Sequence, residues 1–519
     1  MIGLFDGGCF AGHDLETGFW YPVENLLADF DRYGVARGLV GSYRCLYQDV
    51  REGNREAAEW AARFPDRLIP LAILHPVYYG ESPEKLLCWL KRDLGFQVVG
   101  LFSSPAYHAV EWDSPAVRRV GEVAAELGIV LQAGICTEAE LAGVMRAWGE
   151  LRMPVMIRWM AGHRYKTLAS EMVVAARCPD FRFDVGNMSS NGMLERAVEC
   201  MGAERLFLAS NTPHNIPACP YAAFRDAQLT AAQRSLIGGE TIRRAFGLGT
   251  GDLPSSSFPF RDEADWEGLR TCPKVDIHWH PDHWNLGEPC LSEAEQIDTF
   301  GRYGYERVIM FSILALNYDL KAGNAQTAAW FGRDARVFGL IVVNPLQQSA
   351  SFEQIERYAD HPRFVGIKTI QDVFGLGLDD ALYEPILERA AEKGLPVLAH
   401  MPSLDIAAQR HPEITFVAAH ANWGRAQRFI DLPNVCFDFS TGHALRHETQ
   451  LGRFIQAVGV RRLLFGSDGQ VVSPQWSLAK LYAADLQAVD YSFILRENAY
   501  RVFPKLRRPE DRCLKHEPS

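Results

Sequence analysis

Several features that would narrow the class of protein are missing from this sequence. Its 11 cysteines include no C-x-x-C pair and lie mostly in apolar segments, which favours reduced thiols in a cytoplasmic protein over a disulfide framework. No apolar run approaches the roughly 20 residues that span a bilayer, so we expect no membrane segment. The first residues, MIGLFDGGCF, lack a basic start and a long apolar core, so we expect no signal peptide.

Excess positive charge is also missing. The formal net charge is −11 and the pI is about 5.8, which argues against nucleic acid as a partner. Hydrophobic residues make up 48% of the chain and charged residues 23%, a balance typical of a well-packed globular protein. At 519 residues, the chain is long enough for two large domains.

What the sequence does contain is an internal repeat. Arg32-Tyr33-Gly34 recurs as Arg302-Tyr303-Gly304, at an offset of 302 − 32 = 270. Phe183-Asp184 recurs as Phe437-Asp438, at an offset of 437 − 183 = 254. Other matches keep the same order. Gly53-Asn54 matches Gly323-Asn324 at an offset of 323 − 53 = 270, and Val99–Leu101 with Val365–Ile367 and Ala124–Gly128 with Ala390–Gly394 both have an offset of 266 (365 − 99 and 390 − 124). Ordered matches with a stepwise drift predict two copies of one fold that differ by loop insertions.

Each copy has the usual length of a (β/α)8 barrel, about 250 residues. Short apolar or β-branched runs alternate with amphipathic stretches such as Ser292–Tyr303, which predicts parallel strands joined by helices. Eight strands are expected in the second copy, at Val275–His278, Arg307–Phe311, Val337–Val343, Phe364–Thr369, Pro396–His400, Ile414–His420, Val435–Asp438 and Arg462–Ser467. The sequence therefore predicts an α/β protein of two tandem TIM-type barrels. The alternative is a doubly wound open sheet, but no glycine-rich phosphate turn follows the first strand of either copy.

The repeat and the local composition set the expected domain boundaries. We expect a first barrel over residues 1–248 and a second over residues 274–504. Residues 249–273, with Gly-Thr-Gly-Asp and Leu-Pro-Ser-Ser-Ser-Phe-Pro, are expected to form a linker. Residues 505–519 are expected to form a charged tail.

The strand ends of the second copy carry a set of polar residues. Catalytic residues of such barrels lie at the C-terminal ends of the strands. The first strand ends in His278 and His280, which share a face because alternate strand residues point the same way. The fourth, fifth, sixth and eighth strands end in Lys368, His400, His420 and Asp468. Singly, each residue has a structural alternative, such as a hydrogen-bonded core histidine, a lysine that reaches solvent, or a helix-capping aspartate. Together, they predict a functional site on one rim.

With these motifs, the second copy resembles the amidohydrolase superfamily. Within it, the resemblance is to the branch that includes aminocarboxymuconate-semialdehyde decarboxylase, related aromatic-acid decarboxylases and lactone hydrolases. The motifs are Asp276-Ile277-His278-Trp279-His280, Gly366-Ile367-Lys368, Ala399-His400-Met401-Pro402 and Phe465-Gly466-Ser467-Asp468. The resemblance covers residues 274–504 with the motifs intact and residues 1–248 in fold pattern only.

The resemblance implies a single divalent metal ion held by the second copy. Its ligands would be His278, His280, His400 and Asp468, a set that suits Zn²⁺, with Mn²⁺ or Fe²⁺ as alternatives. Asp468 would also act as general base, and His420 would polarise a substrate carbonyl or carboxylate, or carry a proton.

The resemblance also suggests residues that contact the substrate. Lys368 would meet substrate charge; in relatives with two metal ions, a lysine at this position is carbamylated and bridges them. The remaining candidates for substrate contact follow the sixth and seventh strands: Asn422, Trp423, His443 and Arg446.

The first copy is expected to have lost this site. By the same alignment, its residues in place of the six are Gly8 for His278, Phe10 for His280, Phe102 for Lys368, Gly134 for His400, Arg158 for His420 and Asn211 for Asp468. Such residues cannot assemble a metal site, so we expect a non-catalytic barrel. Paired with the second, it would form a pseudo-dimer within one chain, and further homo-oligomers stay open.

Three functional hypotheses follow. The leading one is a metal-dependent hydrolase of a small carboxylated, lactone or amide-type substrate. A nonoxidative metal-dependent decarboxylase needs nearly the same ligands and is the close alternative. A non-catalytic scaffold or binding protein is the third, and the complete set of residues in the second copy argues against it.

Overall fold

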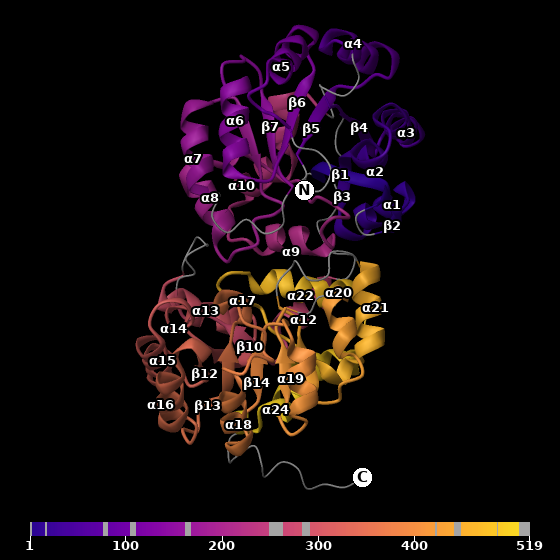
Figure 1. The fold of residues 1–519 in the computed structure, drawn as a ribbon. Helices are drawn as coiled ribbons and strands as arrows, with labels where there is room; N and C mark the ends of the chain where they lie inside the picture. Colours follow the sequence, from indigo (N-terminus) through magenta and orange to yellow (C-terminus); the bar gives the residue numbers. More distant parts are fainter. Residues whose placement is uncertain are drawn as a thin grey trace. The chain divides into compact units, whose positions relative to one another are not determined.

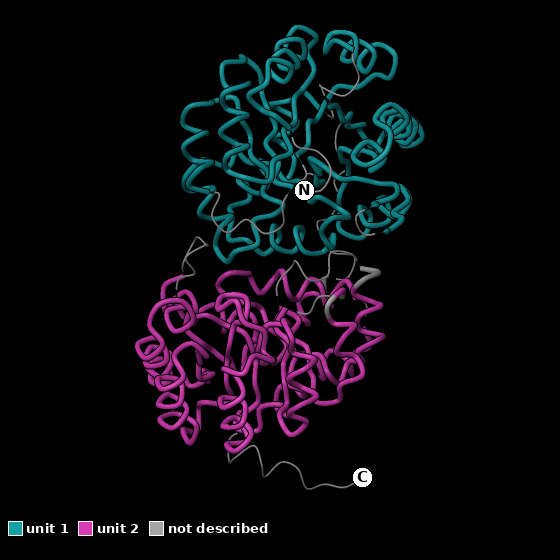
Figure 2. Tube along the Cα trace, viewed as in Figure 1, with its two compact units in different colours: residues 1–264 teal, residues 265–519 magenta. Residues whose placement is uncertain are grey.

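The computed structural model describes residues 3–15, 18–75, 81–103, 110–160, 168–248, 263–282, 291–420, 423–440, 448–484 and 486–507. The chain divides into two compact units, Met1–Ala264 and Asp265–Ser519 (Figure 2). In each unit, parallel strands are followed by helices, as the alternating sequence pattern predicts (Figure 1). No helix in the described part of the chain is long and apolar enough to cross a membrane.

The first unit contains a sheet of nine strands in the order β2-β1-β3-β4-β5-β6-β7-β8-β9. The strands are β1 (Leu4–Asp14), β2 (Phe19–Tyr21), β3 (Val35–Ser42), β4 (Leu68–Ile73), β5 (Val98–Phe102), β6 (Val130–Ile135), β7 (Val155–Trp159), β8 (Phe181–Asp184) and β9 (Leu206–Phe207). Only β2 runs antiparallel to its neighbour among the described strands. The other eight correspond to the predicted barrel.

The helices of the first unit follow these strands in the chain. They are α1 (Val23–Tyr33), α2 (Tyr43–Tyr47), α3 (Val50–Arg63), α4 (Pro83–Asp93), α5 (Pro115–Leu127), α6 (Glu138–Trp148), α7 (Leu168–Arg177), α8 (Met193–Met201), α9 (Ala218–Asp226), α10 (Ala231–Ser235) and α11 (Thr241–Phe246), with the short turns η1 (Ala203–Arg205) and η2 (Leu236–Glu240). Side chains cap several of their first turns; Thr137 and Glu140, for example, form a reciprocal capping box at α6.

The second unit contains eight parallel strands in chain order. They are β10 (Lys274–Trp279), β11 (Tyr305–Met310), β12 (Val337–Val342), β13 (Phe364–Thr369), β14 (Val397–Ala399), β15 (Phe416–Ala418), β16 (Val435–Asp438) and β17 (Leu463–Leu464). Each overlaps one of the eight predicted strands. The structure shortens β14, β15 and β17, so that His400, His420 and Asp468 lie just beyond the strand ends.

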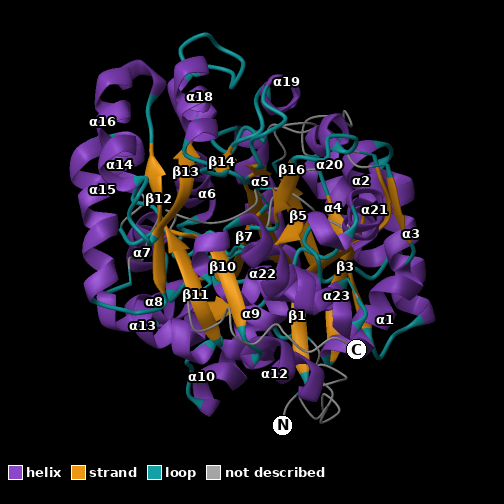
Figure 3. Cartoon of the chain, turned by 90° about the horizontal axis from the view of Figure 1, so that it is seen from below, coloured by secondary structure: helices purple, strands orange, loops and turns teal. Residues whose placement is uncertain are grey.

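Helices cover the strands of the second unit on the outside (Figure 3). They are α12 (Glu263–Thr271), α13 (Glu293–Arg302), α14 (Ile313–Asn317), α15 (Leu320–Ala329), α16 (Gln348–Tyr358), α17 (Gln371–Phe374), α18 (Glu384–Glu392), α19 (Leu404–Arg410), α20 (Trp423–Ala426), α21 (Glu448–Val458), α22 (Pro474–Ala483), α23 (Ala488–Ser492) and α24 (Asn498–Val502), with the short turns η3 (Trp330–Gly332), η4 (Pro345–Gln347), η5 (Gln427–Phe429), η6 (Val460–Arg462), η7 (Phe493–Glu497) and η8 (Pro504–Leu506). A buried apolar cluster joins strand residues such as Leu340, Leu398 and Val417 to Ala499 and Phe503 near the chain's last helix.

Backbone hydrogen bonds join the first strand of each unit to the segment that follows its last strand. In the second unit, Ile277 N donates to Phe465 O at 3.1 Å, and Trp279 forms a parallel bridge with Gly469. In the first unit, Gly7 N donates to Leu208 O at 2.7 Å. These bonds close both sheets, and the prediction of an α/β fold with two tandem TIM-type barrels is confirmed.

A buried asparagine repeats in the two units and fixes the alignment of their strands. Asn54 Nδ2 donates to Ile73 O at 2.9 Å, and its Oδ1 accepts from Ile73 N at 2.9 Å. Asn324 makes the same two bonds with Val342, at 3.0 and 2.9 Å. Ile73 and Val342 are therefore equivalent, at an offset of 342 − 73 = 269, as in the predicted repeat.

The range expected to be a linker includes a helix. Residues 249–262 lie outside the described residues, but Glu263–Thr271 form helix α12, which belongs to the second unit from Asp265 onward. Trp266 of this helix is fully buried and packs edge-on against Tyr482, with ring centroids 5.8 Å apart. Lys274 Nζ donates to the carbonyl oxygens of Arg270 and Cys272, at 2.9 and 2.6 Å. The second unit therefore begins before its first strand. Most of the predicted tail, residues 508–519, lies outside the described residues.

Candidate metal centre

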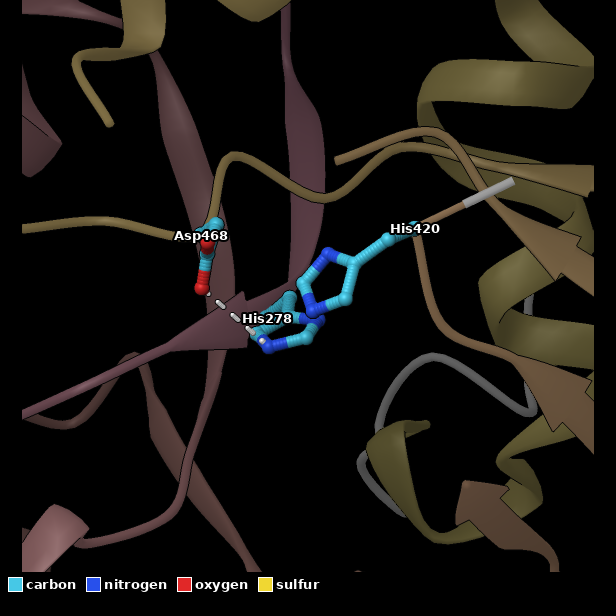
Figure 4. Close-up of side chains that lie close together, drawn as sticks. All are labelled: His278, His420 and Asp468. Carbon is cyan, nitrogen blue, oxygen red and sulfur yellow. Dashed lines mark ion pairs between the residues drawn. The ribbon is translucent and has the colours of Figure 1, made fainter. Parts of the chain in front are cut away.

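Three side chains of the second unit bring potential metal ligands together. One ligand atom from each of His278, His420 and Asp468 lies within 4.8 Å of the other two. Asp468 Oδ1 is 3.3 Å from His278 Nε2, the contact drawn in Figure 4. His278 comes from β10, whereas the other two residues follow β15 and β17. Among the described residues, no other group of three meets this criterion.

His420 and Asp468 share an unusual backbone conformation. Their φ angles are +56° and +61°, in the left-handed region that residues other than glycine seldom adopt. Each follows the end of its strand, where the left-handed conformation departs from the regular pleat. Such conformations in non-glycine residues concentrate at functional sites, where the surrounding structure holds them.

The other two predicted metal ligands border this cluster. His280 Nε2 lies 3.0 Å from Asp468 Oδ1. The ring of His400 meets that of His420 edge-on, with centroids 4.9 Å apart. The close cluster therefore differs from the predicted ligand set in two respects: it includes His420, which was expected to act on the substrate, and it leaves His280 and His400 at its border.

Each of the four imidazoles has a hydrogen-bonding partner at Nδ1. His278 Nδ1 lies 2.5 Å from Asp438 Oδ2, and His280 Nδ1 lies 3.1 Å from the carbonyl oxygen of Phe311. The other two contacts are His400 Nδ1 with Asp372 Oδ2 at 2.8 Å and His420 Nδ1 with Ser440 Oγ at 2.9 Å. Partners of this kind orient the rings of metal-binding histidines.

Sequence reasoning did not find Asp372, Asp438 and Ser440, which hold these rings. Asp438 and Ser440 stand at the end of β16, in the segment Asp438-Phe439-Ser440. Their position at the end of a strand is the available signal, whereas the substrate contacts predicted after the seventh strand, His443 and Arg446, lie further along the chain. Residues that hold a ligand carry no spacing pattern of their own.

Burial controls the charge of the histidines. It lowers the pKa of His278 and His420 well below the ordinary value, and the positive charge of Lys368 acts in the same direction. Burial also lowers the pKa of His400, partly offset by Asp372. Neutral imidazoles beside a carboxylate are the donors that bind Zn²⁺ and other divalent transition metals. The donor set therefore fits a divalent metal ion.

Lys368 is a buried cation at the same rim. Lys368 lies on β13 and is fully buried, and its Nζ has no hydrogen-bond partner among the described residues. The ammonium lies 4.9 Å from the ring centroid of Phe311, which also packs against His278 and His280. Burial lowers the pKa of Lys368 to about 8, opposed by the carboxylates of Asp438, Asp468 and Asp372. An unpaired buried ammonium is a ready partner for an anionic ligand.

The remaining predicted substrate contacts are not tested by the structure. Asn422, His443 and Arg446 lie outside the described residues. Trp423 begins helix α20, so only its backbone position is described. The four residues stay predictions.

In the first unit, the equivalent positions carry no metal ligand. The correspondence between aligned strands places Gly8, Phe10, Gly134 and Asn211 where His278, His280, His400 and Asp468 stand. Asn211 shares the left-handed backbone of its counterpart, with a φ of +57°. Neither glycine, phenylalanine nor an amide offers the imidazole or carboxylate that a zinc site requires.

Strand pairing corrects two of the predicted equivalences. Ile73 pairs with Gly100 and Val342 with Lys368, so Gly100, rather than Phe102, is the equivalent of Lys368. The predicted alignment was wrong by two residues there. A slip of two keeps every side chain on the same face of the sheet, so the hydrophobic pattern does not reveal it.

The second correction concerns His420. Pairing of β7 with β8 and of β15 with β16 aligns Ile157 with Ala418, at an offset of 418 − 157 = 261. Trp159, rather than Arg158, is therefore the equivalent of His420. The expected loss of ligands holds with both corrections, because glycine and tryptophan replace lysine and histidine.

Arg158 fills the centre of the first unit instead. Its side chain is fully buried and hydrogen-bonds to Gln132 Oε1 and Gly8 O at 2.9 Å each, and also to Asn211 Oδ1. Burial lowers the pKa of Arg158, but its ordinary value is so high that the guanidinium stays charged. The guanidinium of Arg158 thus occupies the centre of the first unit, where the second unit has its candidate metal ligands.

Comparison with known families agrees with this geometry. A family model described as Amidohydrolase matches residues 20–248 and 306–505, more than half of the chain. The chain belongs to the amidohydrolase family. The two matched segments fall in the two units, so the chain contains two copies of the family's barrel. No curated protein matches the chain.

Solved structures also resemble this chain. A 2,6-dihydroxybenzoate decarboxylase from Rhizobium is 15% identical, with a TM-score of 0.36 over 46% of this chain and 99% of that one. A 5-carboxyvanillate decarboxylase from Novosphingobium aromaticivorans, complexed with manganese and 4-hydroxy-3-methoxy-5-nitrobenzoic acid, is 14% identical, with a TM-score of 0.36 over 46% of this chain and 98% of that one.

Proposed function

We propose that the second unit is a metal-dependent hydrolase of a small carboxylated, lactone or amide-type substrate. The observation that carries the proposal is the approach of His278, His420 and Asp468, whose ligand atoms lie within 4.8 Å of one another. His280 and His400 border them and complete the predicted metal site. Zn²⁺ suits this donor set best, with Mn²⁺ and Fe²⁺ as alternatives.

When bound, a divalent metal ion polarises a substrate oxygen and lowers the pKa of a water molecule toward about 7. The roles proposed for the chain's own residues follow from their positions. Asp468, next to His278 and His280, accepts the proton of the attacking water. His420 directs Nε2 toward the substrate and polarises its carbonyl or returns the proton.

Lys368 is proposed to hold the substrate. Its buried ammonium has no hydrogen-bond partner among the described side chains, so a carboxylate or a developing oxyanion of the substrate would supply one. Asn422, Trp423, His443 and Arg446 are proposed as further contacts, because they follow the same strand ends.

A nonoxidative decarboxylase is the second candidate. The position of Lys368 favours it too, because an ammonium beside the metal ligands could bind a carboxylate that is later lost as carbon dioxide. The ligands required for the two reactions are nearly the same. Their products distinguish them, since hydrolysis consumes water and produces an acid, whereas decarboxylation releases carbon dioxide.

We propose that the first unit is non-catalytic and serves as the partner barrel of a pseudo-dimer. The substrate is proposed to be a small molecule and the compartment the cytoplasm. The nine described cysteines are free thiols, as a reducing compartment would keep them.

The deciding experiment measures the metal content of the full chain purified without chelator. We expect about one metal ion per chain, because one complete ligand set is present. The His278→Ala variant should lose the metal, and the exposed His361→Ala variant should keep it. Equal metal content in the parent and His278→Ala would refute the assignment. Release of carbon dioxide from a panel of aromatic carboxylic acids would favour the decarboxylase.

A further inference from the structure

A continuous hydrogen-bonded chain links His420 to His278. His420 Nδ1 lies 2.9 Å from Ser440 Oγ, which lies 2.7 Å from Asp438 Oδ2, which in turn lies 2.5 Å from His278 Nδ1. Ser440 and Asp438 are both buried. Bulk water therefore does not compete for these bonds, and the direction of each one is set by its neighbours.

The Asp438 carboxylate determines which atom donates in each of these hydrogen bonds. A carboxylate only accepts, so the Ser440 hydroxyl donates to Asp438 Oδ2 and its oxygen accepts the N–H of His420 Nδ1. Asp438 Oδ2 also accepts the N–H of His278 Nδ1. Both imidazoles then carry their proton on Nδ1. Their Nε2 atoms keep a free electron pair, the form that binds a metal ion or accepts a proton.

The carboxylate itself is held from the other side. Asp438 Oδ1 accepts the backbone N–H of Ser440 at 2.8 Å, so one residue donates to both oxygens of the same carboxylate. Ser440 Oγ also lies 3.4 Å from His278 Nδ1. The hydroxyl thus stands between the carboxylate and both rings.

The first unit provides an internal comparison for this arrangement. Asp184 is the equivalent of Asp438, and Gly186 that of Ser440, both at an offset of 254 (438 − 184 and 440 − 186). Asp184 accepts the backbone N–H groups of Trp159 and Gly186, at 2.7 and 3.0 Å. A Cβ atom at Gly186 would lie 1.5 Å from the carbonyl oxygen of Ala209, so no serine fits there. The aspartate remains without histidines, whereas the hydroxyl is present only in the unit that has them.

We propose that Ser440 is a positioning residue that transmits the charge of Asp438 to His420 and fixes its Nδ1-protonated form. One carboxylate oxygen thereby sets the tautomer of two histidines. The inference rests on the proposed function, in which His278 Nε2 faces the metal and His420 Nε2 faces the substrate. The proposal gives the two groups different roles. The aspartate, present in both units, supports the fold, whereas the Ser440 hydroxyl, present only in the second unit, serves the site.

The test compares the full-length chain with its Ser440→Ala and Ser440→Thr variants. Each protein is labelled with ¹⁵N in histidine only and freed of metal, and the ring-nitrogen shifts of His420 are assigned with a His420→Gln variant. In the parent and in Ser440→Thr, we expect Nδ1 of His420 to be the protonated nitrogen. In Ser440→Ala, the shifts should move to a mixture of tautomers or to the Nε2-protonated form, while the melting temperature stays close to that of the parent.

Zinc affinity, measured by competition with a chromophoric chelator, provides the second measurement. Ser440 also donates to Asp438 Oδ2, which holds the metal ligand His278. We therefore expect a loss of about 10- to 100-fold in Ser440→Ala, the range typical for removal of an outer-shell partner, and near-parental affinity in Ser440→Thr. Unchanged His420 shifts in Ser440→Ala, or the same change in both variants, would overturn the proposal. A parent that binds no zinc would instead refute the proposed function, and the tautomer of His420 in the metal-free protein would still decide the role of Ser440.

Discussion

The guanidinium carbon of Arg158 lies 2.1 Å from the position that a Cβ atom would take at Gly8. The first unit has therefore not merely lost a histidine at this position; the space is filled by another side chain. Gly134 is similar, because a Cβ atom there would lie 2.1 Å from the ring of Phe102. Both positions are packed as a core, so a histidine substituted at either one would not fit unless Arg158 or Phe102 moved.

We predict that Gly8→Ala destabilises the protein by more than about 3 kcal/mol, because overpacking beside a fixed side chain forces the backbone to move. Arg158 cannot easily yield, since its hydrogen bonds to Gln132, Asn211 and Gly8 hold it in place. Chemical denaturation of the parent and the variant measures the difference in the free energy of unfolding.

The matched control for this prediction is Gly301→Ala in helix α13, where nothing lies within 4 Å of the added Cβ atom. It should be neutral or slightly stabilising, because alanine is the better helix former. The double variant Gly8→Ala/Arg158→Ala should lose less stability than the sum of its two single variants. Strict additivity would show that the two residues do not compete for this space.

How far the sequence predicted the fold and the site depends on the kind of signal. The repeat, the eight strands of the second unit and the clustering of His278, His420 and Asp468 were predictable, because alternation and strand-end position are local patterns. The role of Asp276 was not predictable, because the sequence presents it only as the first residue of the Asp276–His280 motif. Its Oδ1 accepts the backbone N–H groups of His278 and Ser467, at 3.0 and 3.1 Å, so it fastens the first strand to the segment after the last.

Three results required the structure. The equivalence of Phe102 with Lys368 was wrong because it followed the match of Val99–Leu101 with Val365–Ile367, which is two residues out of register with the strand pairing. The equivalence of Arg158 with His420 was wrong because β7 and β15 share no sequence motif, and only their pairing with neighbouring strands aligns them. Partners at Nδ1, such as Ser440, could not be predicted because nothing in their spacing distinguishes them.

The helix inside the expected linker leads to a second prediction. Trp266→Ala should destabilise the protein by about 3 to 5 kcal/mol, the usual cost of removing a buried tryptophan side chain. Trp266 is fully buried against Tyr482, whereas Trp20 is 58% exposed. Trp20→Ala is therefore the control and should leave the melting temperature nearly unchanged. Equal melting temperatures of Trp266→Ala and the parent would mean that residues 263–271 behave as a linker after all.

The lowered pKa values of the histidines predict how metal binding depends on pH. Burial lowers the pKa of His278 and His420 well below 6.5, so these rings stay neutral at pH values where exposed histidines become charged. We expect zinc affinity to change little between pH 8 and pH 6.5 and to fall only at lower pH. Competition titrations across this range measure it. A steep fall already between pH 7.5 and pH 6.5 would contradict the prediction.

The same shift affects the stability of the metal-free protein. A histidine whose pKa is lowered in the folded state binds fewer protons there than in the unfolded chain, so acidification favours unfolding. The free energy of unfolding should therefore decrease as the pH falls below about 6.5, which is the pKa of histidine in the unfolded chain. His278→Phe should weaken this dependence, because phenylalanine does not bind protons.

Lys368 combines a cost in stability with its proposed role in binding. Its buried ammonium has no hydrogen-bond partner among the described residues, and its pKa is lowered to about 8. The unfolded chain therefore binds this proton more tightly than the folded protein does, which destabilises the folded state. The effect is largest below the folded pKa of about 8 and disappears above the unfolded pKa of about 10.4. We predict that Lys368→Met raises the free energy of unfolding of the metal-free protein at pH 7, on the order of 2 kcal/mol.

The gain should shrink as the pH rises from about 8 toward about 10.4, because the parent lysine is neutral in both states only above the higher value. Lys321→Met is the control, since Lys321 is a surface residue paired with Glu353 and its replacement should change stability by less than about 0.5 kcal/mol at either pH. If Lys368 holds the substrate carboxylate, the more stable Lys368→Met variant should also show a KM at least tenfold higher for any substrate found in the panel. A variant that is less stable than the parent at pH 7 would mean that the ammonium is paired in the folded protein, and its role as a vacant anion partner would have to be abandoned.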